Sequence, residues 1–205
     1  MTPPRIATMT VDEFTSALAA KQPVPGGGAA SACVLAQASA LGSMVIAYTR
    51  GKPKFEAHQH RLERLDMIFS SARADALELA DRDAAAYLNL NTLWKLPAQE
   101  RNQLPHWHAA VAEAVAAPSA IADLATGVLA ALATMSTITS TQLASDLRIA
   151  QLFAHAALEG ALMNVQVNLP LIMDGASRAS CEQFIASRRG EGARLVAAPS
   201  AHERK

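Results

Sequence analysis

The 205-residue sequence has few aromatic residues, only two cysteines and no excess of charge of either sign. Aromatics make up 4% of the chain, whereas alanine occupies 45 of its 205 positions, so the predicted core consists of small side chains that let helices approach closely. Lys plus Arg equals Asp plus Glu at 18 each, which argues against nucleic acid or an acidic membrane surface as a partner.

Cys33 and Cys181 lie in a chain without a recognisable secretory signal, so we expect reduced thiols in a cytoplasmic protein. Two apolar segments, 28–48 and 121–138, approach transmembrane length. Polar residues interrupt both, and neither has the Leu/Ile/Phe density that membrane insertion requires. We interpret them as buried helices of a soluble bundle that has no membrane partner.

Helical periodicity runs through most of the chain, without a strand pattern or an internal repeat. Thr10 and Glu13 form a capping box that starts a short helix. Further helices are predicted at about 28–49, 55–95, 107–117, 119–135 and 142–173, with a weaker one from 175 to 189 and a break at Pro118. The expected fold is all-α: one domain of long antiparallel helices over residues 1–189, followed by a disordered tail over 190–205.

The most constrained stretch is Pro23–Ser31, with the sequence PVPGGGAAS. Pro25 and the proline before it hold the chain extended, and Gly26, Gly27 and Gly28 leave the backbone uncovered where a helix begins. Free N–H groups at such a helix start suit a carboxylate, a phosphate or a polar ring edge, although a tight turn is the alternative. A Walker loop is excluded because no Gly-Lys-Ser/Thr follows, and no strand precedes to form a dinucleotide fingerprint.

A carboxylate falls on the apolar stripe of the 55–95 helix. Asp83 continues the three- and four-residue spacing of Leu62, Leu65, Phe69, Ala72, Ala76 and Leu79, and Ala86 and Leu90 follow it. Burial of an unpaired carboxylate is costly and raises its pKa, so Asp83 is a candidate general acid or base. A structural hydrogen bond to a neighbouring helix N-terminus is the alternative.

The last long helix carries further polar candidates. Asn164 and Asn168 continue the stripe of Leu143, Leu147, Ala150, Ala154, Ala157 and Ala161, and buried amides need partners or a polar ligand. Glu159 stands on another face, and Asp146 near the helix start suits the helix dipole. Helix–helix contacts are the alternative role for all four.

Lys52 and Lys54 occupy the turn after the glycine-led helix and would matter if the substrate carried carboxylates. Two lysines in a turn are more often simply solvated. The only paired histidines, His58/His60 and His106/His108, lack a ligand set at metal-binding spacing, so no metal site is predicted.

Four segments together resemble the cyclodeaminase/cyclohydrolase family: 23–28 (PVPGGG), 51–55 (GKPKF), 81–84 (DRDA) and 157–169 (ALEGALMNVQVNL). The resemblance covers about residues 11 to 174. It implies a helical homodimer with a folate site near the glycine loop and the subunit interface, and proton-transfer chemistry that needs no metal or redox cofactor.

The resemblance also suggests roles for the candidates. Asp83 or Asp146 would move protons, Gly26–Gly28 and Asn164 would hold the pterin and its one-carbon unit, and Lys52 and Lys54 would face the glutamate tail. We therefore expect a stand-alone methenyltetrahydrofolate cyclohydrolase, with formiminotetrahydrofolate cyclodeaminase as the close alternative. Pro53, Phe55 and Gln166 depart from the family pattern and leave open a third possibility, a dimer that binds a pterin without turning it over.

Overall fold

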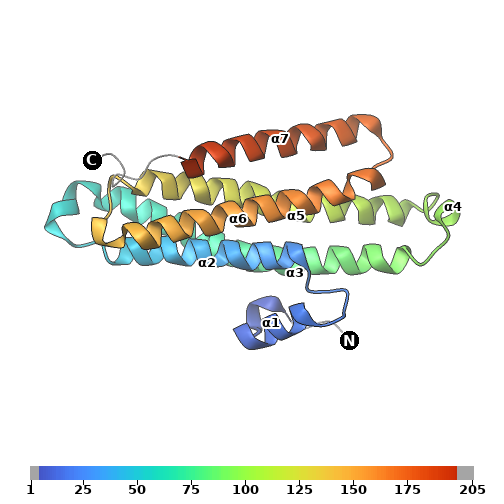
Figure 1. The fold of residues 1–205 in the computed structure, drawn as a ribbon, viewed down its shortest axis with the longest axis horizontal. Coiled ribbons are helices and arrows are strands. Elements are labelled where there is room, and N and C mark those ends of the chain that lie inside the picture. The colour runs from blue at the N-terminus through green and yellow to red at the C-terminus, as the bar shows by residue number, and fades with distance from the viewer. Residues whose placement is uncertain (1–4, 198–205) are drawn as a thin grey trace.

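The computed structural model describes residues 5–197, which form α-helices, turns and short 3-10 helices without a strand. Four long helices make the bundle: α2 (Gly27–Ala47), α3 (Gln59–Leu93), α5 (Pro105–Met135) and α6 (Ala144–Asn168). α2 and α5 each pack against both α3 and α6. α7 (Gly175–Ala197) lies along α5 and α6, and α4 (Ala98–Arg101) joins α3 to α5. α1 (Val11–Ala19) lies at the side of the bundle (Figure 1), where its Phe14 is partly buried against the core. The all-α prediction is confirmed.

The predicted helix starts follow from local hydrogen bonding. The capping box before α1 is complete, because the Glu13 N–H donates to Thr10 Oγ1 at 3.1 Å and the Thr10 N–H donates to Glu13 Oε2 at 2.6 Å. Past the end of α2, Gly51 has φ +73°, the left-handed conformation that glycine adopts without strain. The chain then turns back through a 3-10 helix, Pro53–His58, into α3.

Small residues set the distance between the helices of the core. A Cβ on Gly42 of α2 would lie 3.0 Å from the ring of Phe69 on α3, which is fully buried. A Cβ on Gly160 of α6 would collide with the Ser31 hydroxyl on α2. Alanines fill most of the remaining contacts, so α2 packs closely against two neighbours at once.

α2 and α5 are long and apolar enough to cross a membrane by length and composition alone. At least half of the residues in the most apolar window of each helix are buried inside the bundle. These apolar residues therefore contact other helices of the bundle.

Two expectations about helix boundaries are wrong. The expected break at Pro118 is absent, because α5 runs from Pro105 to Met135 with the proline inside it. α7 continues to Ala197, so residues 190–197, expected in a disordered tail, are helical. The remaining residues of that tail, 198–205, lie outside the described part of the chain.

A hydrogen bond from another helix explains how α5 accommodates its proline. Pro118 has no N–H, so the carbonyl of Ala114 one turn earlier loses its usual partner within the helix. The side-chain Nδ2 of Asn168, at the end of α6, donates to this carbonyl at 2.8 Å and also to the Asn164 carbonyl at 3.0 Å. A polar residue 50 positions away thus supplies the bond that the proline removes.

This compensation predicts coupling between the two positions. Asn168→Ala should lower the free energy of unfolding by about 1–3 kcal/mol, because it leaves the Ala114 carbonyl unpaired in a buried position. In a Pro118→Ala background the restored N–H can bond that carbonyl, so the same change should cost clearly less. Urea unfolding of the four proteins in this double-mutant cycle measures the difference. Equal costs in both backgrounds would show that the Asn168 contact does not compensate for the proline.

Candidate functional site

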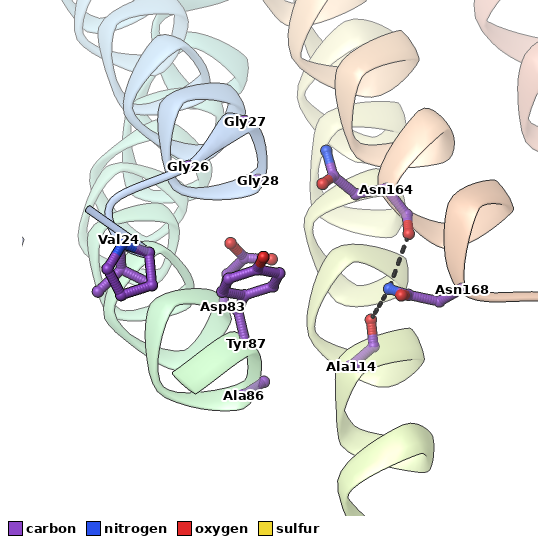
Figure 2. Close-up of a pocket in the computed structure, with 11 residues that line it drawn as sticks. Val24, Gly26, Gly27, Gly28, Asp83, Ala86, Tyr87, Ala114, Asn164 and Asn168 are labelled. Atoms are coloured by element: carbon purple, nitrogen blue, oxygen red, sulfur yellow. Dashed lines mark hydrogen bonds between the residues drawn. The ribbon is translucent and has the colours of Figure 1, made fainter. Parts of the chain in front are cut away.

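A cavity of about 260 Å³ lies where α2 begins, because α3 and α5 continue past the first turn of that helix (Figure 1). The cavity is lined by the glycine loop and by residues from α3, α5 and α6: Pro23, Val24, Gly26, Gly27, Gly28, Asp83, Ala86, Tyr87, Ala114, Asn164 and Asn168. Figure 2 shows the glycine turn above Asp83 and Tyr87, with the two asparagines on the opposite wall. Segments up to 145 positions apart in sequence (Pro23 and Asn168) therefore share one cavity.

Asp83 lies directly against the glycine turn. A Cβ added to Gly28 would collide with all three atoms of the Asp83 carboxyl group, at 2.2–2.4 Å, so only glycine fits at this position. Burial raises the pKa of Asp83 to about 6, against a smaller lowering by the backbone N–H of Ala29. The structural alternative considered for this residue, a hydrogen bond to a helix N-terminus, is therefore present, and burial raises the pKa of the same carboxyl group.

The start of α2 supplies hydrogen-bond donors to the same cavity. Gly26 is the N-cap residue and has an extended backbone, and no side chain caps the helix. The first N–H groups of an α-helix have no partner within the helix. The Ala29 N–H interacts with Asp83, whereas the N–H groups of Gly27 and Gly28 have no hydrogen-bond acceptor among the described residues and face the same cavity.

The opposite wall presents two amides. Asn164 Nδ2 donates to the Gly160 carbonyl at 2.8 Å, and Asn168 Nδ2 donates to the carbonyls of Ala114 and Asn164. Because the amino groups are engaged, the side-chain oxygens are left as acceptors, and no described residue donates to them. Gly27 keeps this wall close to α2, since a Cβ there would contact the Asn164 amide at 3.5 Å.

Tyr87 is a cavity residue that the sequence reasoning missed. It lies one helical turn after Asp83 on α3, and its side chain is 43% exposed. An aromatic residue four positions after a seam carboxylate, in a chain with 4% aromatics, was the available signal. Its ring gives the cavity an apolar face suited to a flat heterocycle.

Other sequence candidates are not at this cavity within one chain. Lys52 and Lys54 follow the far end of α2, roughly 30 Å from Gly27 at 1.5 Å per residue. Asp146 is in the first turn of α6, roughly 27 Å along the helix from Asn164. Glu159 accepts a hydrogen bond from Arg189 of α7 at 3.0 Å, and Pro25 lines a different cavity.

The described residues contain no cluster of three or more His, Cys, Asp or Glu side chains that could hold a metal ion. The cavity combines four kinds of group: the Asp83 carboxyl, the side-chain oxygens of two asparagines, backbone N–H groups at the start of α2, and the Tyr87 ring. Together with the fold, these features define a helical-bundle protein with one polar cavity shared by the start of α2 and by α3, α5 and α6.

The chain belongs to the formiminotransferase-cyclodeaminase family, whose model matches residues 10–187. It is 31% identical over 178 residues to formimidoyltransferase-cyclodeaminase of Sus scrofa, covering 85% of this chain and 33% of that protein. It is 28% identical over 163 residues to methenyltetrahydrofolate cyclohydrolase of Methylorubrum extorquens, covering 78% of each. The chain thus spans about a third of the Sus scrofa relative and a larger share of the bacterial one.

A solved structure shows the same fold. Formiminotetrahydrofolate cyclodeaminase from Thermotoga maritima superposes with a TM-score of 0.86 at 25% identity, covering 93% of both chains. The expected family is therefore confirmed. The names of the Methylorubrum extorquens and Thermotoga maritima proteins include a tetrahydrofolate, the first as a cyclohydrolase and the second as a cyclodeaminase.

The raised pKa of Asp83 predicts a pH-dependent stability cost. Asp83 is protonated in both states below its ordinary pKa of 3.8, and stability is lost as the pH rises from there through the folded-state pKa of about 6. The full loss is on the order of 3 kcal/mol. Asp83→Asn should therefore raise the free energy of unfolding at about pH 8, and the gain should vanish near about pH 4.

Asp75→Asn is the matched control, since Asp75 is an exposed residue of the same helix that accepts a hydrogen bond from Ser71. Urea unfolding across this pH range should show no comparable gain for it. A gain from Asp83→Asn that is independent of pH would disprove the titration as its cause.

Proposed function

We propose that this chain is a methenyltetrahydrofolate cyclohydrolase, which interconverts 5,10-methenyl- and 10-formyltetrahydrofolate. The observation that carries the proposal is Asp83, a carboxyl group with a pKa of about 6 beneath the open start of α2. A group that must accept a proton and then return it works best when its pKa lies near the operating pH. The names of the relatives supply the substrate class.

The cavity suits the pyrimidine side of a pterin. The ring's amino and N–H groups would donate to the side-chain oxygens of Asn164 and Asn168, and its carbonyl would accept from the N–H groups at the start of α2. Tyr87 would lie against a ring face. This orientation would bring the one-carbon unit toward Asp83.

In the proposed reaction water adds to the cationic methenyl carbon and gives one proton to the Asp83 carboxylate. The bond from that carbon to N5 then breaks, Asp83 returns its proton to N5, and the hydroxyl proton leaves to solvent as the formyl carbonyl forms. The ionised carboxylate also favours the cationic substrate electrostatically. Asp83 is thus the base of the first step and the acid of the second.

Formiminotetrahydrofolate cyclodeaminase is the second candidate, and the family description and the Thermotoga maritima structure favour it. There N10 attacks the carbon of the formimino group, whose nitrogen is already protonated (CH=NH2+). The N10 proton passes to the Asp83 carboxylate, and Asp83 gives it to the departing NH2 group, which leaves as ammonia as the methenyl cation forms. The same carboxyl group would carry out both proton transfers. The choice between the two reactions is therefore one of substrate.

Two assays separate these functions. The first follows the absorbance of 5,10-methenyltetrahydrofolate against its uncatalysed hydrolysis, and the second follows ammonia release from the 5-formimino derivative. Asp83→Asn should lower kcat by about 10²–10⁴ in whichever assay the wild-type protein is active, because it removes the proton acceptor. Asp75→Asn should leave the rate unchanged.

An unchanged rate in Asp83→Asn would remove this residue from the mechanism. Activity in the ammonia assay alone would select the cyclodeaminase. Tight binding of a tetrahydrofolate without turnover in either assay would instead support a pterin-binding protein.

We further propose that the chain forms a cytoplasmic homodimer through the outer face of α6. Ile149, Leu152, Met163 and Val167 are 41–69% exposed, and their spacing places them within about 60° around the helix axis. A continuous exposed apolar stripe of this kind is typical of a contact surface. If the second copy were antiparallel, it would bring its Lys52, Lys54 and Asp146 toward the first copy's cavity.

Both cysteines are unpaired in the described structure, which supports a reducing compartment.

The double variant Leu152→Glu/Met163→Glu should shift the protein to monomer, because it places two like charges in the centre of the apolar stripe. Light scattering coupled to size exclusion measures the mass. Met67→Glu/Ile68→Glu on the outer surface of α3 is the matched control and should remain dimeric. If the α6 double variant remains a dimer, the interface lies on another surface.

A further inference from the structure

The amide of Asn168 lies on the wall of the site cavity and is held in one orientation. Its Nδ2 donates to the Ala114 carbonyl at 2.8 Å and to the Asn164 carbonyl at 3.0 Å, as Figure 2 shows. An amide nitrogen has two hydrogens to donate, so both are used. Turning the amide over would place Oδ1 against two carbonyl oxygens. The side-chain oxygen is therefore the atom left for a ligand.

Pro118 is the reason that the Ala114 carbonyl needs this donor. α5 has no N–H at the proline, so the carbonyl lacks the bond that an α-helix normally supplies. A turned Asn168 amide would leave this buried carbonyl unpaired. Pro118 is itself buried and is not part of the cavity lining, so it acts on a ligand only through Asn168.

The Asn168 oxygen comes last in a row of three groups around the cavity. The start of α2 supplies N–H donors from Gly27 and Gly28. Asn164 lies next to them, because a Cβ on Gly27 would contact its amide at 3.5 Å. Asn168 lies one turn further along α6. The wall thus offers a donor, an acceptor and a second acceptor in this order.

The 2-amino-4-oxopyrimidine edge of a pterin carries the complementary order: a carbonyl, a ring N–H and an amino group. The start of α2 would bind the carbonyl, Asn164 the ring N–H and Asn168 the amino group. We propose that Pro118 is a positioning residue that fixes Asn168 as the acceptor for this amino group, an inference that rests on the proposed function. A proline outside the cavity thus decides which ligand edge the wall accepts.

The test compares two substrates that differ in one group. One is 5,10-methenyltetrahydrofolate, and the other carries a methyl group in place of the 2-amino group, which is similar in size and donates no hydrogen bond. The ratio of their kcat/KM values measures recognition of the amino group. The wild-type protein should prefer the amino substrate at least about tenfold, because the methyl group leaves the Asn168 oxygen without a donor. If only the 5-formimino substrate is turned over, the same pair of 5-formimino derivatives is used.

Pro118→Ala should lower this ratio at least about threefold, because the restored N–H pairs the Ala114 carbonyl and releases the amide. The change should lie mainly in KM for the amino substrate, with kcat little altered. Asn168→Ala should bring the ratio close to one, both alone and in the Pro118→Ala background, where the restored N–H supports the fold. Pro105→Ala is the matched control, since this exposed proline begins the same helix and should leave the ratio unchanged.

The orientation itself can be measured without a ligand. Both Nδ2 hydrogens of Asn168 should exchange slowly with solvent in NMR spectra of the wild-type protein, and at least about tenfold faster in Pro118→Ala. Their signals are identified by their absence from Asn168→Ala. Equal exchange rates would overturn the positioning role, whatever the substrate is.

An unchanged ratio in Pro118→Ala, or equal losses on both substrates, would also overturn it, since a purely structural role of the proline affects both substrates alike. A further fall in the ratio when Pro118→Ala is added to Asn168→Ala would contradict action through the asparagine. A wild-type protein that neither turns over nor binds a tetrahydrofolate in calorimetry would instead overturn the proposed function, and the exchange rates would still report on the amide.

Discussion

The contact between the Asp83 carboxyl group and the backbone of Gly28 is the constraint around which the cavity is built. The carboxyl group can lie beneath the start of α2 only because no Cβ intervenes, and it gains the N–H of Ala29 in return. This gain is smaller than the cost of burial, so the pKa of Asp83 remains raised. The same arrangement therefore makes the bundle less stable at neutral pH and makes the carboxyl group able to exchange protons.

Much of the fold and part of the site could be predicted because the signals were local. Each candidate at the cavity interrupted a regular pattern: three glycines before a helix, and Asp83, Asn164 and Asn168 on otherwise apolar stripes. Asp146 and Glu159 lacked this property. Asp146 and Asn164 belong to the same straight helix, 18 residues apart, so a single chain cannot bring both to one cavity.

The features that sequence did not predict depend on distant partners. α7 continues past residue 189, where Gly192 lies against Leu158 and the Val196 carbonyl accepts from Arg148 of α6. Pro118 stays inside a helix because Asn168 supplies the missing bond. No local propensity contains this information, because each outcome is decided by a residue at least 34 positions away.

The bond between Asn168 and the Ala114 carbonyl also bears on how α5 and α6 are aligned along their axes. Two alanine-rich surfaces resemble themselves after a shift of one turn, so packing alone distinguishes poorly between a correct alignment and a slipped one. Pro118 creates one carbonyl on α5 that lacks a partner within its helix, and α6 carries the donor that matches it. A slip of one turn would leave the Ala114 carbonyl without its donor, whereas Asn168 would keep only its bond to the Asn164 carbonyl. A residue that usually ends helices thus favours one alignment of two helices.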